Sequence, residues 1–370
     1  MAITTFSFPT TILFGPGAID RLPAELEKRN MKRPLLVTDA GLASTPLIAR
    51  VRALVPHSPV FSDVEPNPTE MNVLDGAAYY ARHGCDSLIG VGGGSPLDAA
   101  KAIRLKATHA LDLAEYDDNI GGEARIGPNV PPYVAVATTA GTGSEVGRSA
   151  VIIIAKTNRK TVIFSPHLIP SLAIDDPELT VGLPAHVTAG AGMDALTHNV
   201  EAYLSRGFHP ICDSIAIGGA RLASENLPRA MANPADLEAR GYMLMASMMG
   251  AMAFQKGLGA THSLAHPLSS EFRMHHGTAN AVLLPSVLEF NREAVLARMQ
   301  DLAAAFGAEP VERVRELNRI CGIAPRLRDY AVPQEALPAL AAKAVEDGCH
   351  LLNPRPCTEA ELLALYRAAW

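Results

Sequence analysis

The first half of the chain places its hydrophobic residues in short runs that alternate with stretches of helical spacing. Residues 69–84, for example, repeat apolar positions at helical intervals between two such runs. An antiparallel hairpin is expected over 149–166, where apolar runs flank the polar segment KTNRK, and 171–177 is expected to form one further strand. The other β-rich runs are residues 33–39, 60–64, 85–93 and 133–139. This alternation predicts an α/β fold with a largely parallel sheet covered by helices.

The pattern changes near residues 177–185, beyond which β-branched alternation almost disappears. Apolar periodicities of the helical kind follow at 186–205, 209–231, 234–256, 278–305, 310–321, 334–347 and 358–369. The second half is therefore predicted to be an all-α helical bundle. We place the boundary so that residues 1–183 form the α/β domain and residues 184–370 form the helical domain.

The composition narrows the classes of partner and compartment. The 370 residues carry a formal net charge of −6, with Lys and Arg scattered along the chain, so neither nucleic acid nor an anionic membrane is an expected partner. Apolar runs such as AVIIIA at 150–155 are far shorter than the roughly 20 residues of a membrane-spanning helix, and no signal-peptide pattern is found. The five cysteines contain no CxxC pair, which argues against a disulfide framework and a thiolate metal site. We expect a cytoplasmic protein.

A glycine-rich turn, GVGGGSPLDAAK at 90–101, follows a predicted strand and opens a predicted helix. Unpaired N–H groups and the positive end of the helix can bind a phosphate at such a turn, and the glycines at 92–94 allow a pyrophosphate to approach the backbone. Ser95 is expected to be the N-cap, Pro96 the first helical residue and Asp98 the N3 position. The spacing departs from the GxGxxG fingerprint because Ser95 stands where the last glycine should fall. A tight turn without a ligand is the alternative.

A second turn of small residues, TTAGTGSEV at 138–146, also follows a predicted strand. Open α/β sheets bind nucleotides where the carboxyl ends of their strands meet, so the two turns predict a Rossmann-like dinucleotide-binding domain. Asp39 ends the strand at 33–39, and a carboxylate there can accept the ribose hydroxyls and repel a 2′-phosphate, which favours NAD over NADP. Two alternatives remain: the threonines satisfy the local backbone, and Asp39 faces the N-terminus of the helix that follows.

The predicted helical domain concentrates potential metal ligands in two segments. In GMDALTH at 192–198, Asp194 and His198 lie four residues apart, so both side chains emerge from one face of a helix. The histidines of the second segment are His262, His266, His275 and His276. A lone Asp/His pair is usually a core or surface feature, but one carboxylate with several imidazoles suits Zn²⁺, Fe²⁺ or another first-row divalent cation. Spacing alone does not select which histidines bind.

Together these segments resemble a known family. GGGSPLDAAK, TTAGTGSEV, GMDALTH and GATHSLAHPLSSEFRMHHGTANA, with FGPGAIDRL near the start, are similar to the iron-containing, or group III, alcohol dehydrogenases. The similarity extends over essentially the whole chain. It implies an amino-terminal dinucleotide domain and a carboxyl-terminal helical domain that holds the metal.

The resemblance also implies roles for individual residues. The implied metal ligands are Asp194, His198, His262 and His276. His266 becomes a neighbouring non-ligand that orients the nicotinamide and relays protons. The residues implied to bind the dinucleotide are Gly93, Gly94, Ser95 and Asp98 at the pyrophosphate and nicotinamide ribose, Thr138, Thr139 and Thr142 at the adenine side, Lys160 at a ribose hydroxyl, and Asp39, which matches the position associated with NAD preference.

Some positions depart from the family pattern. His275 stands where a proline commonly precedes the last ligand, which places a second imidazole beside it. Ser269 replaces a usual glycine, and Gly147 replaces a common threonine after SEV. The implied ligand set is intact. The segment MAFQKGLGA at 252–260 is one residue shorter than in some relatives, so the shape of the pocket is not carried over.

The leading interpretation is an NAD-dependent, divalent-metal-dependent alcohol dehydrogenase, or aldehyde reductase, that transfers hydride between a small primary alcohol and NAD. Fe²⁺ is favoured because Zn²⁺ sites with four protein ligands tend to be closed, although Zn²⁺ can compete for the same ligands. One alternative substrate is a short hydroxy acid such as 4-hydroxybutyrate, whose carboxylate Arg148 or Lys256 could bind unless both face solvent. A dehydroquinate-synthase-like lyase and a non-enzymatic metal- or nucleotide-binding protein are further alternatives. We expect a homo-oligomer, a dimer or larger.

Overall fold

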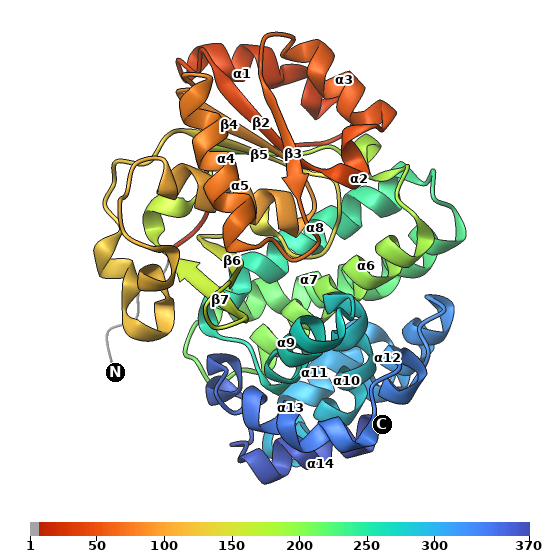
Figure 1. Cartoon of the computed structure of the whole chain (residues 1–370). Coiled ribbons are helices and arrows are strands. Elements are labelled where there is room, and N and C mark those ends of the chain that lie inside the picture. The colour runs from red at the N-terminus through yellow and green to blue at the C-terminus, as the bar shows by residue number, and fades with distance from the viewer. Residues whose placement is uncertain (1–6) are drawn as a thin grey trace. The chain divides into compact units, whose positions relative to one another are not determined.

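The computed structural model describes residues 7–370, which form two compact units. The sheet unit comprises Pro9–Thr139 and Ser144–Thr180. The helical unit comprises Ala140–Gly143, Val181–Trp370 and the described residues before Pro9. In Figure 1 the sheet unit includes the red and orange parts of the chain, and the blue part belongs to the helical unit.

Six parallel strands form the main sheet, in the order β1-β8-β5-β4-β2-β3. Their bounds are Ile12–Phe14 (β1), Pro34–Asp39 (β2), Val60–Val64 (β3), Ser87–Gly92 (β4), Tyr133–Ala137 (β5) and Leu172–Asp175 (β8). The central strands β4, β5 and β8 are buried along their whole length, as expected where both faces are covered. The predicted parallel sheet is confirmed, and β1 adds an edge strand that the pattern did not predict.

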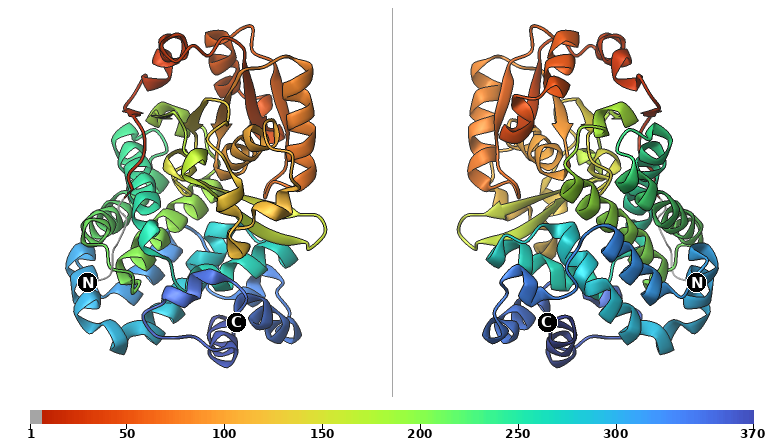
Figure 2. Two further views of the ribbon diagram at one scale, coloured as in Figure 1. Left: turned by 90° about the vertical axis from the view of Figure 1, so that its left-hand side faces the viewer. Right: turned by 90° about the vertical axis from the view of Figure 1, so that its right-hand side faces the viewer.

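Helices cover both faces of this sheet, as the side views in Figure 2 show. They are α1 (Leu22–Lys28), α2 (Ala40–Ala43), α3 (Pro46–Leu54), α4 (Glu70–Arg82) and α5 (Gly94–Lys106). Successive side chains of a strand point to opposite faces. Leu36 of β2 accordingly shares a core with Leu22 of α1 and Val51 of α3. Its neighbour Val37 shares the opposite core with Ile103 of α5.

The hairpin expected over 149–166 is confirmed. Ser149–Ile154 (β6) and Arg159–Phe164 (β7) pair in antiparallel fashion. Asn158 in the turn has φ 49°, a left-handed conformation that asparagine adopts more readily than most residues.

The helical unit is built around α6, in which every residue from Thr188 to Leu204 is buried. Its α-helices are α6 (Ala185–Leu204), α7 (Pro210–Ala232), α8 (Leu237–Ala253), α9 (Ala260–Phe272), α10 (His276–Asn291), α11 (Leu296–Phe306), α12 (Pro310–Ile320), α13 (Leu337–Ala344) and α14 (Glu359–Ala369). A helix buried on all sides must find partners for its polar side chains in the neighbouring helices. Across residues 7–370, no helix is both long and apolar enough to cross a membrane.

The prediction of one helix over 278–305 is wrong. A 3₁₀ turn over Arg292–Val295 separates α10 from α11, and Val295 leaves the helical region with φ −139° and ψ 41°. Both helices bury apolar faces in the same core, so the apolar spacing continues across the turn. No glycine or proline in the sequence marks the break.

Candidate functional site

Asp194 and His198 project from α6, which α10 approaches very closely. A Cβ on Gly277 of α10 would lie 1.9 Å from the carbonyl oxygen of Gly190 in α6 and 3.0 Å from Cβ of Asp194. No other side chain fits at such a contact without moving the backbone. Two glycines therefore bring Asp194 and the first turn of α10, which carries His276, together.

Two side chains fix the N-terminus of α9. Glu201 of α6 accepts hydrogen bonds from the N–H of Gly259 at 3.0 Å and of Thr261 at 2.6 Å. Asn353 accepts the N–H of the residue between them at 3.2 Å. The first N–H groups of a helix have no partner within the helix, so a carboxylate at this end stabilises it. This end of α9 carries His262.

Glu201 also orients the His262 ring. Its carboxylate accepts a hydrogen bond from Nδ1 of His262 at 2.7 Å, and both side chains are buried. Although burial opposes charge on either group, this hydrogen bond raises the pKa of His262 and lowers that of Glu201. With the Nδ1 proton directed at Glu201, Nε2 presents its lone pair on the other side of the ring.

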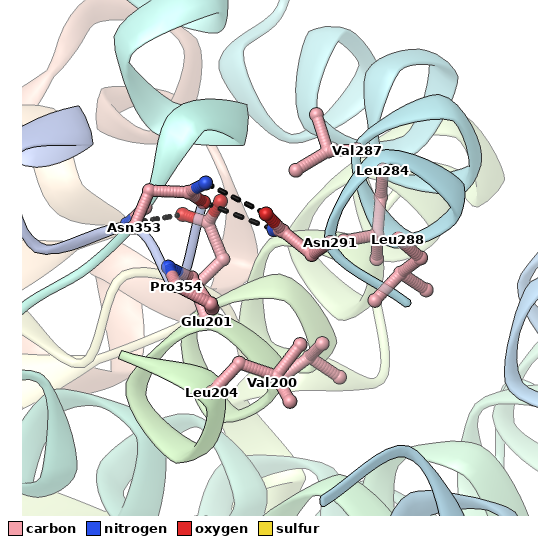
Figure 3. A pocket seen from close by; sticks show the side chains of 10 residues that line it. Val200, Glu201, Leu204, Leu284, Val287, Leu288, Asn291, Asn353 and Pro354 are labelled. Atoms are coloured by element: carbon pink, nitrogen blue, oxygen red, sulfur yellow. Dashed lines mark hydrogen bonds between the residues drawn. The ribbon is translucent and has the colours of Figure 1, made fainter. Parts of the chain in front are cut away.

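A small pocket beside Glu201 supports this arrangement (Figure 3). Asn291 and Asn353 exchange hydrogen bonds of 3.0 and 2.7 Å there. Its apolar lining is Val200, Leu204, Leu284, Val287 and Leu288, with Gly259 and Pro354. The polar groups of the pocket bond to one another and to α9, so we assign it a supporting role and no ligand.

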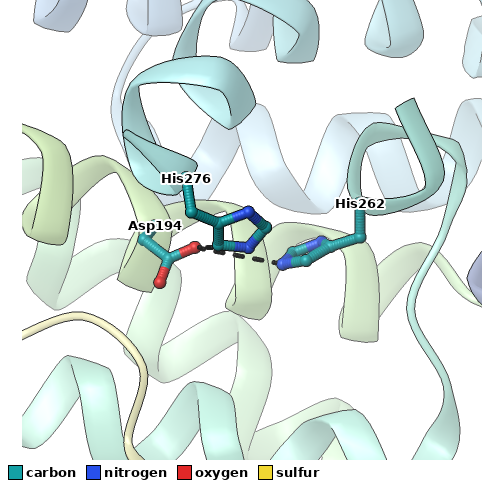
Figure 4. A group of neighbouring side chains, drawn as sticks. All are labelled: Asp194, His262 and His276. Carbon is teal, nitrogen blue, oxygen red and sulfur yellow. Dashed lines mark ion pairs between the residues drawn. The ribbon is translucent and has the colours of Figure 1, made fainter. Parts of the chain in front are cut away.

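Three ligand atoms converge in front of α6 (Figure 4). Oδ1 of Asp194 lies 3.9 Å from Nε2 of His262 and 3.6 Å from Nε2 of His276. The amide nitrogen of Asn280 lies 2.8 Å from the same Oδ1, and 3.4 and 3.3 Å from the two imidazole nitrogens. One amide nitrogen within hydrogen-bond reach of all three atoms shows that the three atoms face one place, which is what a bound cation requires. The group fits a divalent metal ion.

His198 lies beside these three residues. Its ring stacks on that of His262, with centroids 4.7 Å apart, and its Nδ1 lies 4.0 Å from Oδ2 of Asp194. Burial lowers the pKa of His198 to about 4, so the imidazole is neutral at pH 7 and keeps a lone pair for a metal. Its role as a fourth ligand stays a prediction.

The two neighbours of the converging group differ in what they contact. His275 is exposed and its ring covers Gly190, where an added Cβ would lie 2.5 Å from it. The converging group, which could hold a metal ion, contains His276 and not His275. His266 stacks on His276 with ring centroids 5.2 Å apart, and its Nδ1 lies 2.7 Å from Oδ2 of Asp347. Its role as a proton relay stays a prediction.

In the sheet unit, the turn after β4 differs from the prediction in detail. The helix α5 begins at Gly94 with Gly93 as its N-cap, so Ser95 is not the N-cap and Pro96 is not the first helical residue. Ser95 Oγ instead accepts the N–H of Asn67 at 3.3 Å. The cap is a glycine in extended conformation without a capping side chain. The helix N-terminus therefore remains available to an anion.

The second turn lies against the first. The N–H of Thr138 donates to the carbonyl of Gly92 at 3.0 Å, and a Cβ on Gly93 would lie 3.0 Å from Oγ1 of Thr139. The carboxyl ends of the neighbouring strands β4 and β5 thus place both small-residue turns side by side, as in nucleotide-binding α/β sheets.

The remaining residues of the predicted cofactor set have structural partners of their own. Asp39 accepts the N–H of Leu42 at 2.9 Å and caps α2, which was the alternative role considered for it. Asp98 accepts hydrogen bonds from Ser144 Oγ at 2.6 Å and from a β6 N–H at 3.0 Å. Lys160 lies on β7, and Thr142 belongs to the helical unit. The cofactor contacts of these residues stay predictions.

The two cations considered for an anionic substrate are placed differently. Lys256 is buried, ion-paired with Asp213, and donates to the carbonyl of Tyr203 at 2.8 Å. This pairing explains the Lys256 charge without a substrate. Arg148 lies over the ring of Phe164 at 5.2 Å.

Sequence reasoning missed three residues that support the site: Glu201, Asn280 and Asp347. Glu201 follows His198 by three residues on α6, and Asn280 follows His276 by four on α10, so each shares a helix face with a candidate ligand. A search for polar residues at these spacings would have found both. No local pattern marks Asp347.

Comparisons with known proteins match this chain along nearly its whole length to the family that its sequence resembles. A model of iron-containing alcohol dehydrogenases matches residues 9–177, and one of the C-terminal part of the Fe-containing alcohol dehydrogenase family matches residues 188–370. A 4-hydroxybutyrate dehydrogenase of Cupriavidus necator is 41% identical over 93% of this chain and 94% of its own length. A solved 1,3-propanediol oxidoreductase superposes with a TM-score of 0.95 at 39% identity, covering 100% of both chains. A sulfoacetaldehyde reductase from Bifidobacterium kashiwanohense, solved with NAD⁺, gives 0.91 at 29% identity over 100% of this chain and 99% of its own.

Proposed function

Because the chain belongs to the iron-containing alcohol dehydrogenase family, we propose that its substrates are small primary alcohols and the corresponding aldehydes. As a member of this family, it is an NAD-type oxidoreductase that acts on CH–OH groups. The convergence of Asp194, His262 and His276 carries this proposal. A divalent cation bound there supplies a Lewis acid for the substrate oxygen. His198 is the proposed fourth ligand, and Fe²⁺ the proposed ion, since four-ligand Zn²⁺ sites tend to be closed.

The surrounding residues of the helical unit have distinct tasks in this proposal. Glu201 directs Nε2 of His262 toward the cation site. Asn280 donates a hydrogen bond to Asp194. His266 accepts the hydroxyl proton of the alcohol at Nε2 and releases it to water, and in the reverse direction it donates the proton.

The sheet unit supplies the proposed NAD site apart from Thr142, which belongs to the helical unit. Backbone groups at the start of α5 bind the pyrophosphate, and Asp39 selects NAD by repelling a 2′-phosphate. The full proposed contact set is Asp39, Gly93, Gly94, Ser95, Asp98, Thr138, Thr139, Thr142 and Lys160.

One experiment tests the proposed activity. Protein stripped of metal is reloaded anaerobically with Fe²⁺, its metal content is measured, and NADH formation is followed with ethanol, 1-propanol, 1,2-propanediol and 4-hydroxybutyrate. We expect NADH to form with primary alcohols only after metal is restored. Full activity after exhaustive chelation, or no activity on a broad alcohol and aldehyde panel by metal-loaded protein, would overturn the proposal.

A short hydroxy acid is the second candidate substrate, because a relative that is 41% identical is named for 4-hydroxybutyrate. Lys256 is already paired with Asp213, which leaves Arg148 as the candidate for the carboxylate. The ratio of kcat/KM for 4-hydroxybutyrate to that for 1-butanol decides between the two classes. Replacement of Arg148 by methionine should lower that ratio if the acid is the substrate. We also propose that the protein is cytoplasmic and forms a homo-oligomer. Light scattering on the purified protein tests the oligomeric state.

A further inference from the structure

Asp347 sits at a junction of hydrogen bonds outside the candidate metal group. Its Oδ1 accepts the hydroxyl of Ser263 at 2.7 Å and the N–H of Cys349 at 2.9 Å. Its Oδ2 lies 2.7 Å from Nδ1 of His266. Ser263 is itself held, because its oxygen accepts the N–H of His350 at 2.8 Å. Donors on α9 and on the segment after α13 thus fix both carboxylate oxygens.

These contacts determine which nitrogen of His266 carries a proton. Burial opposes ionisation, but the neighbouring His266 and the hydrogen bonds from Ser263 and the Cys349 N–H hold the pKa of Asp347 far below its usual range. An ionised carboxylate only accepts hydrogen bonds. Nδ1 of His266 is therefore the donor, which leaves Nε2 as the ring nitrogen that can accept a proton.

The same cluster, His266, Asp347 and Cys349, could otherwise hold a second metal ion. Metal binding by cysteine requires the thiolate. Burial raises the pKa of the Cys349 thiol well above its usual range, and the charge of Asp347 adds to this effect. In addition, Nδ1 of His266 and Oδ2 of Asp347 are already engaged with each other in a hydrogen bond. The arrangement favours a dyad over a metal site.

We propose that Asp347 is a positioning residue, which fixes the orientation and the Nδ1–H tautomer of His266 so that Nε2 receives the proton of the alcohol. This inference rests on the proposed function. Oxidation of a primary alcohol by NAD⁺ yields the aldehyde, NADH and one proton: the C–H hydride goes to NAD⁺ and the O–H proton goes to the Nε2 lone pair. The His266 side chain is 21% exposed, so water can remove the proton afterwards. The His266 ring stacks on the ring of the candidate ligand His276. His266 therefore lies beside the candidate metal group, where the alcohol is proposed to bind.

If Asp347 only tied α9 to the segment after α13, Asp347→Asn would keep wild-type kcat, because the shape of the junction is kept. The positioning role predicts a loss of kcat instead, for the following reason. The Ser263 hydroxyl and the Cys349 N–H are donors, so the amide oxygen of Asn must face them. The amide N–H₂ then faces Nδ1 of His266 and donates to it. The ring is forced into the Nε2–H tautomer and cannot accept a proton at Nε2, although the shape of the junction is kept.

The test compares Asp347→Asn with Asp347→Ala, His266→Ala and a matched control, Glu335→Gln, whose exposed carboxylate lies elsewhere in the helical unit. Kinetics are measured on metal-loaded protein with its metal content determined. We expect Asp347→Asn to keep its metal and KM, to lose about 100-fold or more in kcat, and to approach the kcat of His266→Ala. We expect Asp347→Ala to retain more kcat than Asp347→Asn, because the tautomer is then free. Wild-type kcat in Asp347→Asn would overturn the proposal.

A second measurement does not depend on activity. Nitrogen-15 NMR of histidine-labelled, Zn²⁺-loaded protein distinguishes the two ring tautomers. The His266 signals should change from protonated Nδ1 in wild type to protonated Nε2 in Asp347→Asn, and should stay unchanged in Glu335→Gln. An unchanged tautomer in Asp347→Asn would overturn the proposal even if no alcohol is oxidised, so its failure is distinguishable from failure of the proposed function. Should Asp347→Ala not fold, Asp347→Asn alone decides the tautomer.

Discussion

Glu201 connects two kinds of stabilisation in one side chain, since it caps α9 and orients His262. We expect Glu201→Gln to weaken metal binding about 10- to 100-fold, the usual cost of removing a partner that orients a ligand. The physical reason is that both carboxylate oxygens of Glu201 accept hydrogen bonds, Oε2 from the Gly259 N–H and from Nδ1 of His262, and Oε1 from the Thr261 N–H. The N–H₂ group of Gln must therefore face one of these N–H donors, which disturbs the contact that orients His262. Competition for Zn²⁺ against a fluorescent chelator measures the change. Glu225→Gln, on the exposed face of α7, is the matched control, and equal affinities in the two variants would contradict the role of Glu201.

A buried carboxylate in the sheet unit makes stability depend on pH. Burial raises the pKa of Glu145 to about 7, although Lys101 nearby opposes the shift. A carboxyl group with a raised pKa in the folded state stabilises the fold fully below its unfolded pKa, and this contribution is lost as the pH rises through about 7. Glu145→Gln cannot ionise, so its free energy of unfolding relative to wild type should increase by about 2 kcal/mol between pH 5 and pH 8.

Urea unfolding at the two pH values measures this difference. Glu27→Gln, at an exposed position of α1, should show no such pH dependence. The comparison across pH removes the constant cost of the substitution, since packing losses are the same at both values. A difference that stays constant from pH 5 to pH 8 would show that Glu145 is ionised in the folded protein.

At the scale of elements, the site depends on how closely α6 and α10 pack. We expect Gly277→Ala to destabilise the helical unit by on the order of 2–3 kcal/mol and to reduce metal content, because the new methyl group would overlap the Gly190 carbonyl. Gly218→Ala in α7 is the matched control, since its Cβ would meet only the flexible end of Met249, and alanine is the better helix former. Thermal unfolding with metal analysis tests both. A Gly277→Ala protein with wild-type stability and metal content would contradict the close-contact account.

The sequence predicted those parts of the site that local spacing determines. The four-residue spacing of Asp194 and His198 on α6 requires only helical periodicity. The cap of α5 was misplaced because a glycine in extended conformation can begin a helix without a capping side chain. The break between α10 and α11 was missed because both helices bury their apolar faces in one core. The spacing of apolar residues indicates which positions are buried, and it does not indicate where the backbone turns.

At the scale of the whole chain, the missed contacts join residues far apart in sequence. Glu201 bonds to His262 across 61 positions, and Asp347 to His266 across 81. Such pairs form only when the helices pack against one another. No local spacing of residues in a single sequence marks them. The family resemblance implied a choice among the ligands that spacing had left open, but it named neither carboxylate. The structure adds the second layer of residues that gives the histidines their orientation.

Metal binding should stabilise the helical unit as a whole, because the candidate ligands come from three helices, α6, α9 and α10. A ligand that binds only the folded state adds about 2.7 kcal/mol when present at 100 times its Kd. Trp370, the single tryptophan of the chain, follows α14, which bonds to α9 through the Tyr366 hydroxyl and the Leu264 carbonyl at 2.6 Å. Its fluorescence should therefore report an unfolding transition that moves to lower temperature on chelation and returns when Zn²⁺ or Fe²⁺ is added back. His262→Ala lacks one ligand and should show almost no shift. An equal metal-dependent shift in that variant would place the cation elsewhere.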